Sequence, residues 1–284
     1  MSDYTRGSVE SADGTVIGYR RLGVGPAVVL VHGGMQAAQN LMGLARALSD
    51  EFTIYLPDRR GRGLSGPHGD DFGILREVED LQALVAATGA ARIFGLSSGA
   101  LVTLRMALAT PVDEQIALYE PPLSVDGSVP TKWVPRYDRE IASGKPAAAL
   151  VTVLKGIGVD PMFARIPRFL LVPLMTVGMH LQSRAPEGDV PIPELIATQH
   201  FDMRLVQDMA DTAADYAALE AQVLLLGGTK SPGFLGAALE QLAGVLPHAR
   251  RVTFSGLGHT APDNDGDPKR VAEALRDFFK EAKN

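Results

Sequence analysis

A serine between glycines, in the segment Gly95-Leu96-Ser97-Ser98-Gly99, follows a short apolar run and precedes a stretch of helix-forming residues. A serine on a sharp strand-to-helix turn presents its hydroxyl to a pocket, so in this context the G-x-S-x-G pattern predicts a nucleophile. The backbone N–H of Ser98 would then lie at the N-terminus of a helix, where it can stabilise an oxyanion. Because glycine and serine are also common in ordinary turns, the rest of the chain must support this interpretation.

A serine hydroxyl becomes an efficient nucleophile when a neighbouring imidazole removes its proton. Among the six histidines, His259 is the one that lies in a loop after the last predicted strand. We therefore expect His259 to act as the base toward Ser97. Two further histidines are retained as candidates for the substrate pocket: His180 and His200.

An oxyanion hole needs two backbone donors aimed at the place where negative charge develops. We expect the N–H of Ser98 to be one of them. The second should come from the turn in His32-Gly33-Gly34-Met35, which follows an apolar run. Gly34 is favoured there because glycine lets the backbone approach a substrate closely, and Met35 is the second choice.

The elements that position these residues alternate between strands and helices. A hairpin is predicted over residues 8–20, with Asp13-Gly14 at its turn. The strands predicted after it are 27–31, 53–58, 91–94, 115–119, 222–226 and 249–254, and the helices are 38–48, 72–88, 100–108, 233–246 and 268–282. Such alternation predicts an α/β fold with a mostly parallel twisted sheet flanked by helices.

The alternation breaks between about residues 121 and 216, a proline-punctuated region with helical stretches and five methionines. We interpret it as a helical cap inserted after the strand that ends at Glu120. The predicted division is a first core part (1–121), the cap (122–216) and a second core part (217–284). Apolar side chains between Met162 and Met179 favour a medium-sized, largely apolar substrate, although most of them must pack the cap onto the sheet.

Three motifs together resemble those of the alpha/beta hydrolase fold family, over nearly the whole chain outside the cap. They are the strand that ends in His32-Gly33-Gly34, the D-x-x-G-x-G-x-S loop from Asp58 to Ser65, and the G-x-S-x-G segment at Ser97. The resemblance implies a serine hydrolase that cleaves a carboxylic ester, lactone or thioester through an acyl-enzyme, without a cofactor. C–C bond hydrolysis, cofactor-free perhydrolase activity and a lyase reaction would use the same residues.

The acid of the triad departs from the family's usual pattern. The usual aspartate follows the strand 222–226, but Gly227-Gly228-Thr229-Lys230-Ser231-Pro232-Gly233 contains no carboxylate. Some family members place the acid one strand earlier, where Glu120 stands, and we expect Glu120 to orient His259. Asp126 is the next candidate, and a dyad without an acid is the third. The missing aspartate also leaves a catalytically silent binding protein as the alternative of another class.

Composition limits the partners of the chain. Its 284 residues are 46% hydrophobic and 21% charged, which fits one large globular domain or one domain that carries an insertion. The net charge of −6, without a long run of like charges, argues against nucleic acid or an anionic membrane as a partner. The absence of cysteine excludes disulfides, thiolate metal sites and cysteine nucleophiles. A small-molecule substrate remains, and the oligomeric state is open, a homodimer included.

Two charged loops and the N-terminus allow further predictions. The run from Asp263 to Asp267 lacks the glycine position and the later glutamate of a helix–loop–helix calcium site, so we expect a solvated acidic loop and no metal. The arginines at 59, 60 and 62 are expected to brace their own loop through salt bridges. The first residues lack the apolar core of a signal peptide, which favours a cytoplasmic location.

Overall fold

A twisted sheet forms the centre of the molecule in the computed structural model, which describes residues 3–110, 115–158, 163, 165–181, 186 and 188–281. Its strand order over the described residues is β1-β2-β4-β3-β5-β6-β7-β8. The strands are β1 (Thr5–Glu10), β2 (Val16–Leu22), β3 (Ala27–Val31), β4 (Thr53–Pro57), β5 (Arg92–Leu96), β6 (Gln115–Tyr119), β7 (Gln222–Gly228) and β8 (Ala249–Phe254). Strand β2 is antiparallel to β1 and β4, and all other neighbours are parallel.

The central strands are predominantly apolar because both faces of the sheet are covered. In β6 every residue is buried. Since successive side chains point to opposite faces, Ile116 and Leu118 join the core on one side, and Ala117 and Tyr119 join the core on the other. Full burial of a large aliphatic side chain contributes roughly 1.5–3 kcal/mol to folding. The strand ends therefore carry the loops on a rigid platform.

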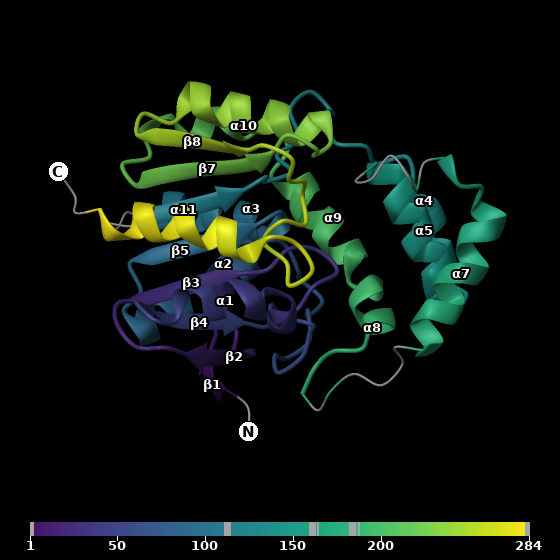
Figure 1. Cartoon of the computed structure of the whole chain (residues 1–284), viewed down its shortest axis with the longest axis horizontal. Helices are drawn as coiled ribbons and strands as arrows, with labels where there is room; N and C mark the ends of the chain where they lie inside the picture. Colours follow the sequence, from purple (N-terminus) through teal and green to yellow (C-terminus); the bar gives the residue numbers. More distant parts are fainter. Residues whose placement is uncertain are drawn as a thin grey trace.

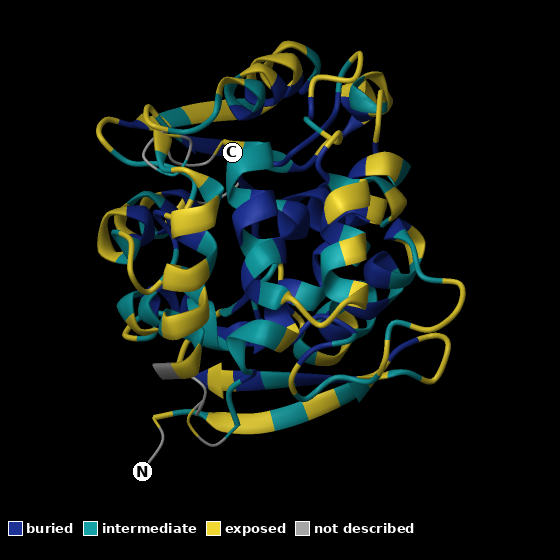
Figure 2. Cartoon of the chain, turned by 90° about the vertical axis from the view of Figure 1, so that its right-hand side faces the viewer, coloured by how far each residue is buried: buried dark blue, intermediate teal, exposed yellow. Residues whose placement is uncertain are grey.

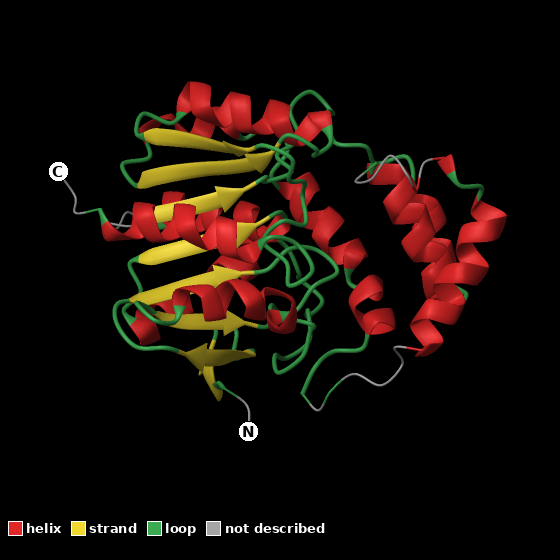
Figure 3. Cartoon of the chain, in the orientation of Figure 1, coloured by secondary structure: helices red, strands yellow, loops and turns green. Residues whose placement is uncertain are grey.

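Helices lie on both faces of the sheet (Figures 1 and 3). The helices α1 (Met42–Leu48) and α11 (Pro268–Lys280) cover one face, and α2 (Ile74–Thr88), α3 (Ser98–Ala109) and α10 (Gly233–Val245) cover the other. The helix predicted from residue 72 begins at Ile74, where the carboxylate of Asp208 accepts the backbone N–H of Ile74 at 3.0 Å and caps the helix. The predicted α/β fold is confirmed.

The region between β6 and β7, residues 122–216, is called here the inserted segment. Its described helices are α4 (Val134–Ala142), α5 (Pro146–Ile157), α7 (Arg168–Leu181), α8 (Ile192–Ala197) and α9 (Gln199–Asp208), and the 3-10 turn η2 (Ala213–Ala218) crosses its end. Figure 1 shows α4, α5 and α7 set apart from the sheet, with α8 and α9 between them and the strand ends. Helix α9 packs against α3, and Leu205 and Met209 belong to the core beneath it. Met162 lies outside the described residues.

Exposure follows this layering. The centre of the molecule is buried, and exposed residues gather on the outward sides of the helices (Figure 2). Helix α7 departs from the usual pattern because Phe169 is 74% exposed and Leu174 is 62% exposed. None of the helices in the described part of the chain is both long enough and apolar enough to cross a membrane.

Candidate active site

Ser97 occupies a strained turn between β5 and α3. Its φ of 54° lies in the left-handed region, which costs a residue with a side chain about 1–3 kcal/mol and persists where the surroundings hold it. The two framing glycines allow the close packing of this turn. A Cβ on Gly95 would lie 2.6 Å from the Cα of Ala100, and a Cβ on Gly99 would collide with the carbonyl oxygen of His32. The G-x-S-x-G pattern therefore reflects the space available at the turn.

Glu120 and His259 meet at the carboxyl end of the sheet. Glu120 directly follows β6 and is 1% exposed, and its Oε2 lies 2.7 Å from Nδ1 of His259. Its other oxygen, Oε1, accepts the backbone N–H of Gly228 at 2.7 Å. The φ of Glu120 is 47°, a second strained backbone position at the site. Asp126, the other candidate acid, is exposed, and its backbone N–H donates to Asp211 at 2.8 Å.

The predicted oxyanion donors lie at the same cavity as Ser97. Gly34, Met35 and Ser98 all line it, and within the described residues none of their backbone N–H groups has a protein acceptor. Gly34 is packed closely against α9, because a Cβ there would lie 2.9 Å from Oε1 of Gln199. The roles of Gly34, Met35 and Ser98 stay predictions.

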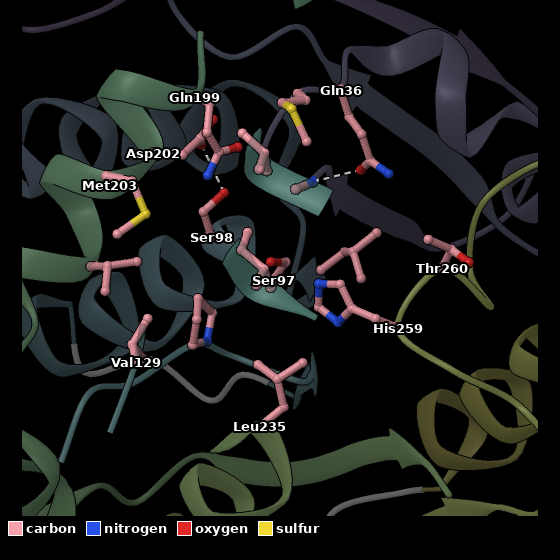
Figure 4. Close-up of a pocket in the computed structure, with 18 of the residues that line it drawn as sticks. Gln36, Ser97, Ser98, Val129, Gln199, Asp202, Met203, Leu235, His259 and Thr260 are labelled. Atoms are coloured by element: carbon pink, nitrogen blue, oxygen red, sulfur yellow. Dashed lines mark hydrogen bonds between the residues drawn. The ribbon is translucent and has the colours of Figure 1, made fainter. Parts of the chain in front are cut away.

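The cavity has a volume of about 290 Å³ and contains both Ser97 and His259 in its lining (Figure 4). Most of its apolar wall comes from the inserted segment and α10: Val129, Val153, Leu154, Ile157, Met203 and Leu235. No described residue of 163–181 lines it, so the apolar side chains described in that stretch do not form the substrate surface that we expected of them; Met162 lies outside the described residues. The pocket histidines that we considered, His180 and His200, also lie elsewhere and are exposed.

Comparison with known proteins identifies the family. The sequence model of the alpha/beta hydrolase family matches residues 28–274. The chain belongs to the alpha/beta hydrolase family. As a member it is a hydrolase. The resemblance in the three sequence motifs is thereby confirmed.

Several relatives of this alpha/beta hydrolase are known. An alpha/beta hydrolase from Sphaerobacter thermophilus is 32% identical, with a TM-score of 0.76 over 96% of this chain and 100% of the other. A pimeloyl-[acyl-carrier protein] methyl ester esterase from Xanthomonas campestris is 29% identical over 90% of this chain and 96% of its own length. An N-formylmaleamate deformylase from Pseudomonas putida is 35% identical, but the match covers 45% of this chain and 49% of that protein.

A buried ion cluster joins the inserted segment of this hydrolase to the turn that carries Ser97 and Ser98. The carboxylate of Asp202, on α9, contacts Arg59 at 2.9 Å and Arg62 at 2.7 Å, and its side chain is 3% exposed. The hydroxyl of Ser98 donates to the same carboxylate at 2.8 Å (Figure 4). Burial alone would raise the pKa of Asp202, but the two arginines outweigh it and hold the pKa below its ordinary value.

Further ion pairs hold the arginine loop in place, and His32 is buried beside it. Arg59 forms a second ion pair with Glu77 at 2.8 Å, and Arg60 pairs with Asp80 at 2.6 Å. The prediction that these arginines brace their own loop is confirmed. His32 is fully buried, and burial together with the nearby arginines places its pKa well below the ordinary value. It is therefore neutral at pH 7, with Nδ1 lying 2.9 Å from the carbonyl oxygen of Gly33 and Nε2 accepting the backbone N–H of Arg59 at 3.2 Å.

Replacing Asp202 by asparagine is expected to lower the free energy of unfolding by about 3–5 kcal/mol, because two buried arginines lose a shared charge partner. Urea unfolding at pH 7 measures the change. Since the folded-state pKa of Asp202 lies below the unfolded value, its contribution is present above the unfolded pKa and is lost as the pH falls toward the folded one. The gap between wild type and variant should therefore narrow in acid.

The matched control is Asp138→Asn on α4, whose exposed partner His200 lies at 3.0 Å. An exposed pair of this kind contributes about 1 kcal/mol or less. If the two substitutions lowered the free energy of unfolding equally, the buried cluster would not have the stabilising role that we assign to it.

Sequence reasoning missed six polar residues of the cavity lining: Gln36, Asn40, Gln199, Asp202, Thr260 and Asp263. Asp263 was expected in a solvated loop, but it is half-buried and its Oδ1 accepts Nε2 of Gln36 at 2.7 Å. Its position four residues after His259 could have indicated that Asp263 lies at the cavity, because the chain that follows a triad histidine starts from the cavity. Asp267 caps α11 by accepting the N–H of Arg270. No cluster of metal-ligating side chains is found in the part of the chain that the structure describes.

Proposed function

We propose that this hydrolase cleaves a carboxylic ester, lactone or thioester of a medium-sized, largely apolar molecule through an acyl-enzyme on Ser97. The observation that carries the proposal is the contact between Glu120 and His259 at 2.7 Å, beside a serine held in a strained turn. The hydroxyl of Ser97 attacks the carbonyl while His259 takes its proton through Nε2. Glu120 keeps the other proton of His259 on Nδ1 and stabilises the imidazolium that forms.

When Ser97 attacks, the carbonyl oxygen becomes an oxyanion that the backbone N–H groups of Ser98 and Gly34 stabilise. Met35 is the alternative to Gly34 as the second donor. His259 then protonates the leaving oxygen, and a water molecule attacks the acyl-enzyme by the reverse sequence of proton transfers. The names of the relatives support acyl chemistry, since one is a methyl ester esterase and another a deformylase. The volume of about 290 Å³ and the largely apolar wall support a small apolar acyl group.

Fluorophosphonate labelling tests the proposal. A fluorophosphonate reacts with a serine that a neighbouring base has activated, so one label per chain is expected, on the peptide that contains Ser97. Mass spectrometry of a digest locates the label, and heat-unfolded protein is the control that removes the activated geometry. A protein that takes no label, or takes it on another residue, would contradict the mechanism.

A further inference from the structure

The cavity has a polar corner that the acyl-enzyme chemistry leaves without a role. Figure 4 shows Gln36, His259 and Thr260 on one side of Ser97, and Val129 and Met203 on the other. Asp263 also lines the cavity and is tied to Gln36, so it belongs to the same side as His259. Ser98, Gln199 and Asp202 also line the cavity on the Met203 side, where Asp202 is already paired with arginines, so the polar group that stays open to a ligand lies on the His259 side.

The corner is held in one arrangement by a chain of hydrogen bonds. The amide oxygen of Gln36 accepts the backbone N–H of Gly33 at 2.9 Å, and its Nε2 donates to Oδ1 of Asp263 at 2.7 Å. These two bonds determine which end of the Gln36 amide faces Asp263. The backbone N–H of Asp263 donates to the carbonyl oxygen of Thr260 at 3.1 Å, which holds the loop after His259.

One carboxylate oxygen of Asp263 is left available to a ligand. Among the described residues, Oδ2 has no hydrogen-bond partner and no cationic side chain forms an ion pair with the carboxylate. A carboxylate removed from bulk water is ordinarily paired with a donor or a cation. Burial raises the pKa of Asp263 to about 7, although the hydrogen bond from Gln36 opposes this shift. The second oxygen, Oδ2, is therefore the atom of this corner that can take a hydrogen-bond donor or a cation.

We propose that Asp263 and Gln36 form a subsite for a leaving group that carries a hydrogen-bond donor or a positive charge, as a second hydroxyl or an ammonium group does. The inference rests on the proposed function and adds the class of alcohol that the enzyme releases. His259 must reach the leaving oxygen to protonate it, so groups attached to that oxygen lie on the His259 side of Ser97. The acyl chain then occupies the apolar side, against Val129 and Met203.

The chemistry of the subsite sets a clear order of substrates. An ionised Asp263 accepts a hydrogen bond from a hydroxyl and attracts an ammonium group, whereas a carboxylate on the leaving group is repelled. Hydrogen bonds to charged groups are worth enough to change kcat/KM by roughly 10- to 100-fold. Leaving groups with an ammonium or a hydroxyl group should therefore be preferred over an alkyl group of equal size, and a carboxylate should be the poorest.

Four butyrate esters that differ only in the alcohol test this order: choline, 2-hydroxyethyl, propyl and carboxymethyl. At pH 8.5, above the pKa of Asp263, we expect kcat/KM for the choline and 2-hydroxyethyl esters to exceed that for the propyl ester by about 10-fold or more. In Asp263→Leu both ratios should fall toward about one, whatever the change in the absolute rates. Asp263→Asn should lose the choline preference and keep much of the hydroxyl preference, because an amide oxygen still accepts.

Asp265→Asn is the matched control, since this carboxylate is two residues away and exposed, and its ratios should equal those of wild type. Unchanged ratios in both Asp263 variants would overturn the subsite. Calorimetric binding of the same esters to Ser97→Ala protein gives a readout without turnover. A choline-over-propyl preference in binding that disappears with Asp263→Leu supports the subsite even where no ester is hydrolysed, and in that case the proposed function fails alone.

Discussion

Ser97→Ala is expected to lower kcat for an activated ester by about 10⁶-fold, the loss that follows removal of a triad serine. Without the hydroxyl no acyl-enzyme forms, and His259 has no proton to take from the nucleophile. The residual rate should come from substrate binding and oxyanion stabilisation by Ser98 and Gly34, which the substitution leaves in place. Initial rates with p-nitrophenyl butyrate measure the loss, and single-turnover mixing shows whether the burst of p-nitrophenol disappears.

The control is Ser231→Ala, at the loop where the family's usual acid is absent. Ser231 does not line the cavity, so its removal should leave kcat within about twofold of wild type. Both variants should unfold within a few degrees of wild type, since neither side chain fills a large buried volume. A Ser97→Ala protein that keeps a tenth of the wild-type rate would show that another group is the nucleophile.

The nucleophile turn could be predicted from sequence because short-range sterics determine it. Gly95 and Gly99 lie so close to the backbone of α3 and β3 that a Cβ on either residue would collide with it. The two glycines of the sequence pattern therefore indicate the geometry of the turn. The central strands could be predicted equally well, since β6 is buried on both faces and its sequence is a continuous apolar run. The pairing of Glu120 with His259 could be predicted from the family resemblance, since some members place the acid one strand earlier, and carboxyl ends of parallel strands meet at one edge of the sheet.

The polar contacts across the cavity could not be predicted in this way. Ser98 and Asp202 are 104 residues apart in the chain, and Gln36 and Asp263 are 227 apart. Nothing local to either partner specifies such a contact. The run after His259 suggests a solvated acidic loop because nothing within the run shows that Asp263 contacts Gln36 on a distant loop.

Helix α7 shows a different limit of sequence reasoning. Its apolar residues suggested a substrate wall, since large apolar side chains are usually buried. In the structure Phe169 and Leu174 face outward, while the wall comes from α5, α9 and the loop at Val129. Which apolar segment of an insertion faces the cavity depends on how its helices pack on one another. Hydropathy carries no information on that choice.

Glu120→Gln is expected to lower kcat by about 10⁴-fold, the loss that follows conversion of a triad acid to its amide. The reason lies in the second contact of Glu120. The backbone N–H of Gly228 donates to Oε1, so a glutamine must place its amide oxygen there and turn its NH₂ toward His259. Nδ1 of His259 then accepts a hydrogen bond and the ring proton moves to Nε2, the nitrogen that must take the proton of Ser97. Comparison of kcat for p-nitrophenyl butyrate between wild type and variant, over a range of pH, measures the loss.

Two further variants separate this tautomer effect from loss of a nearby charge. Asp126→Asn removes the other candidate acid, whose exposed side chain makes no contact with His259 among the described residues, and should leave kcat unchanged. Glu120→Ala cannot donate to Nδ1 and leaves room for water, so it should retain more activity than Glu120→Gln despite removing more of the side chain. Because a glutamine that acts only through lost charge would be no worse than alanine, equal or greater activity in Glu120→Gln would contradict the tautomer argument. Wild-type kcat in Glu120→Gln together with a large loss in Asp126→Asn would move the acid of the triad to Asp126.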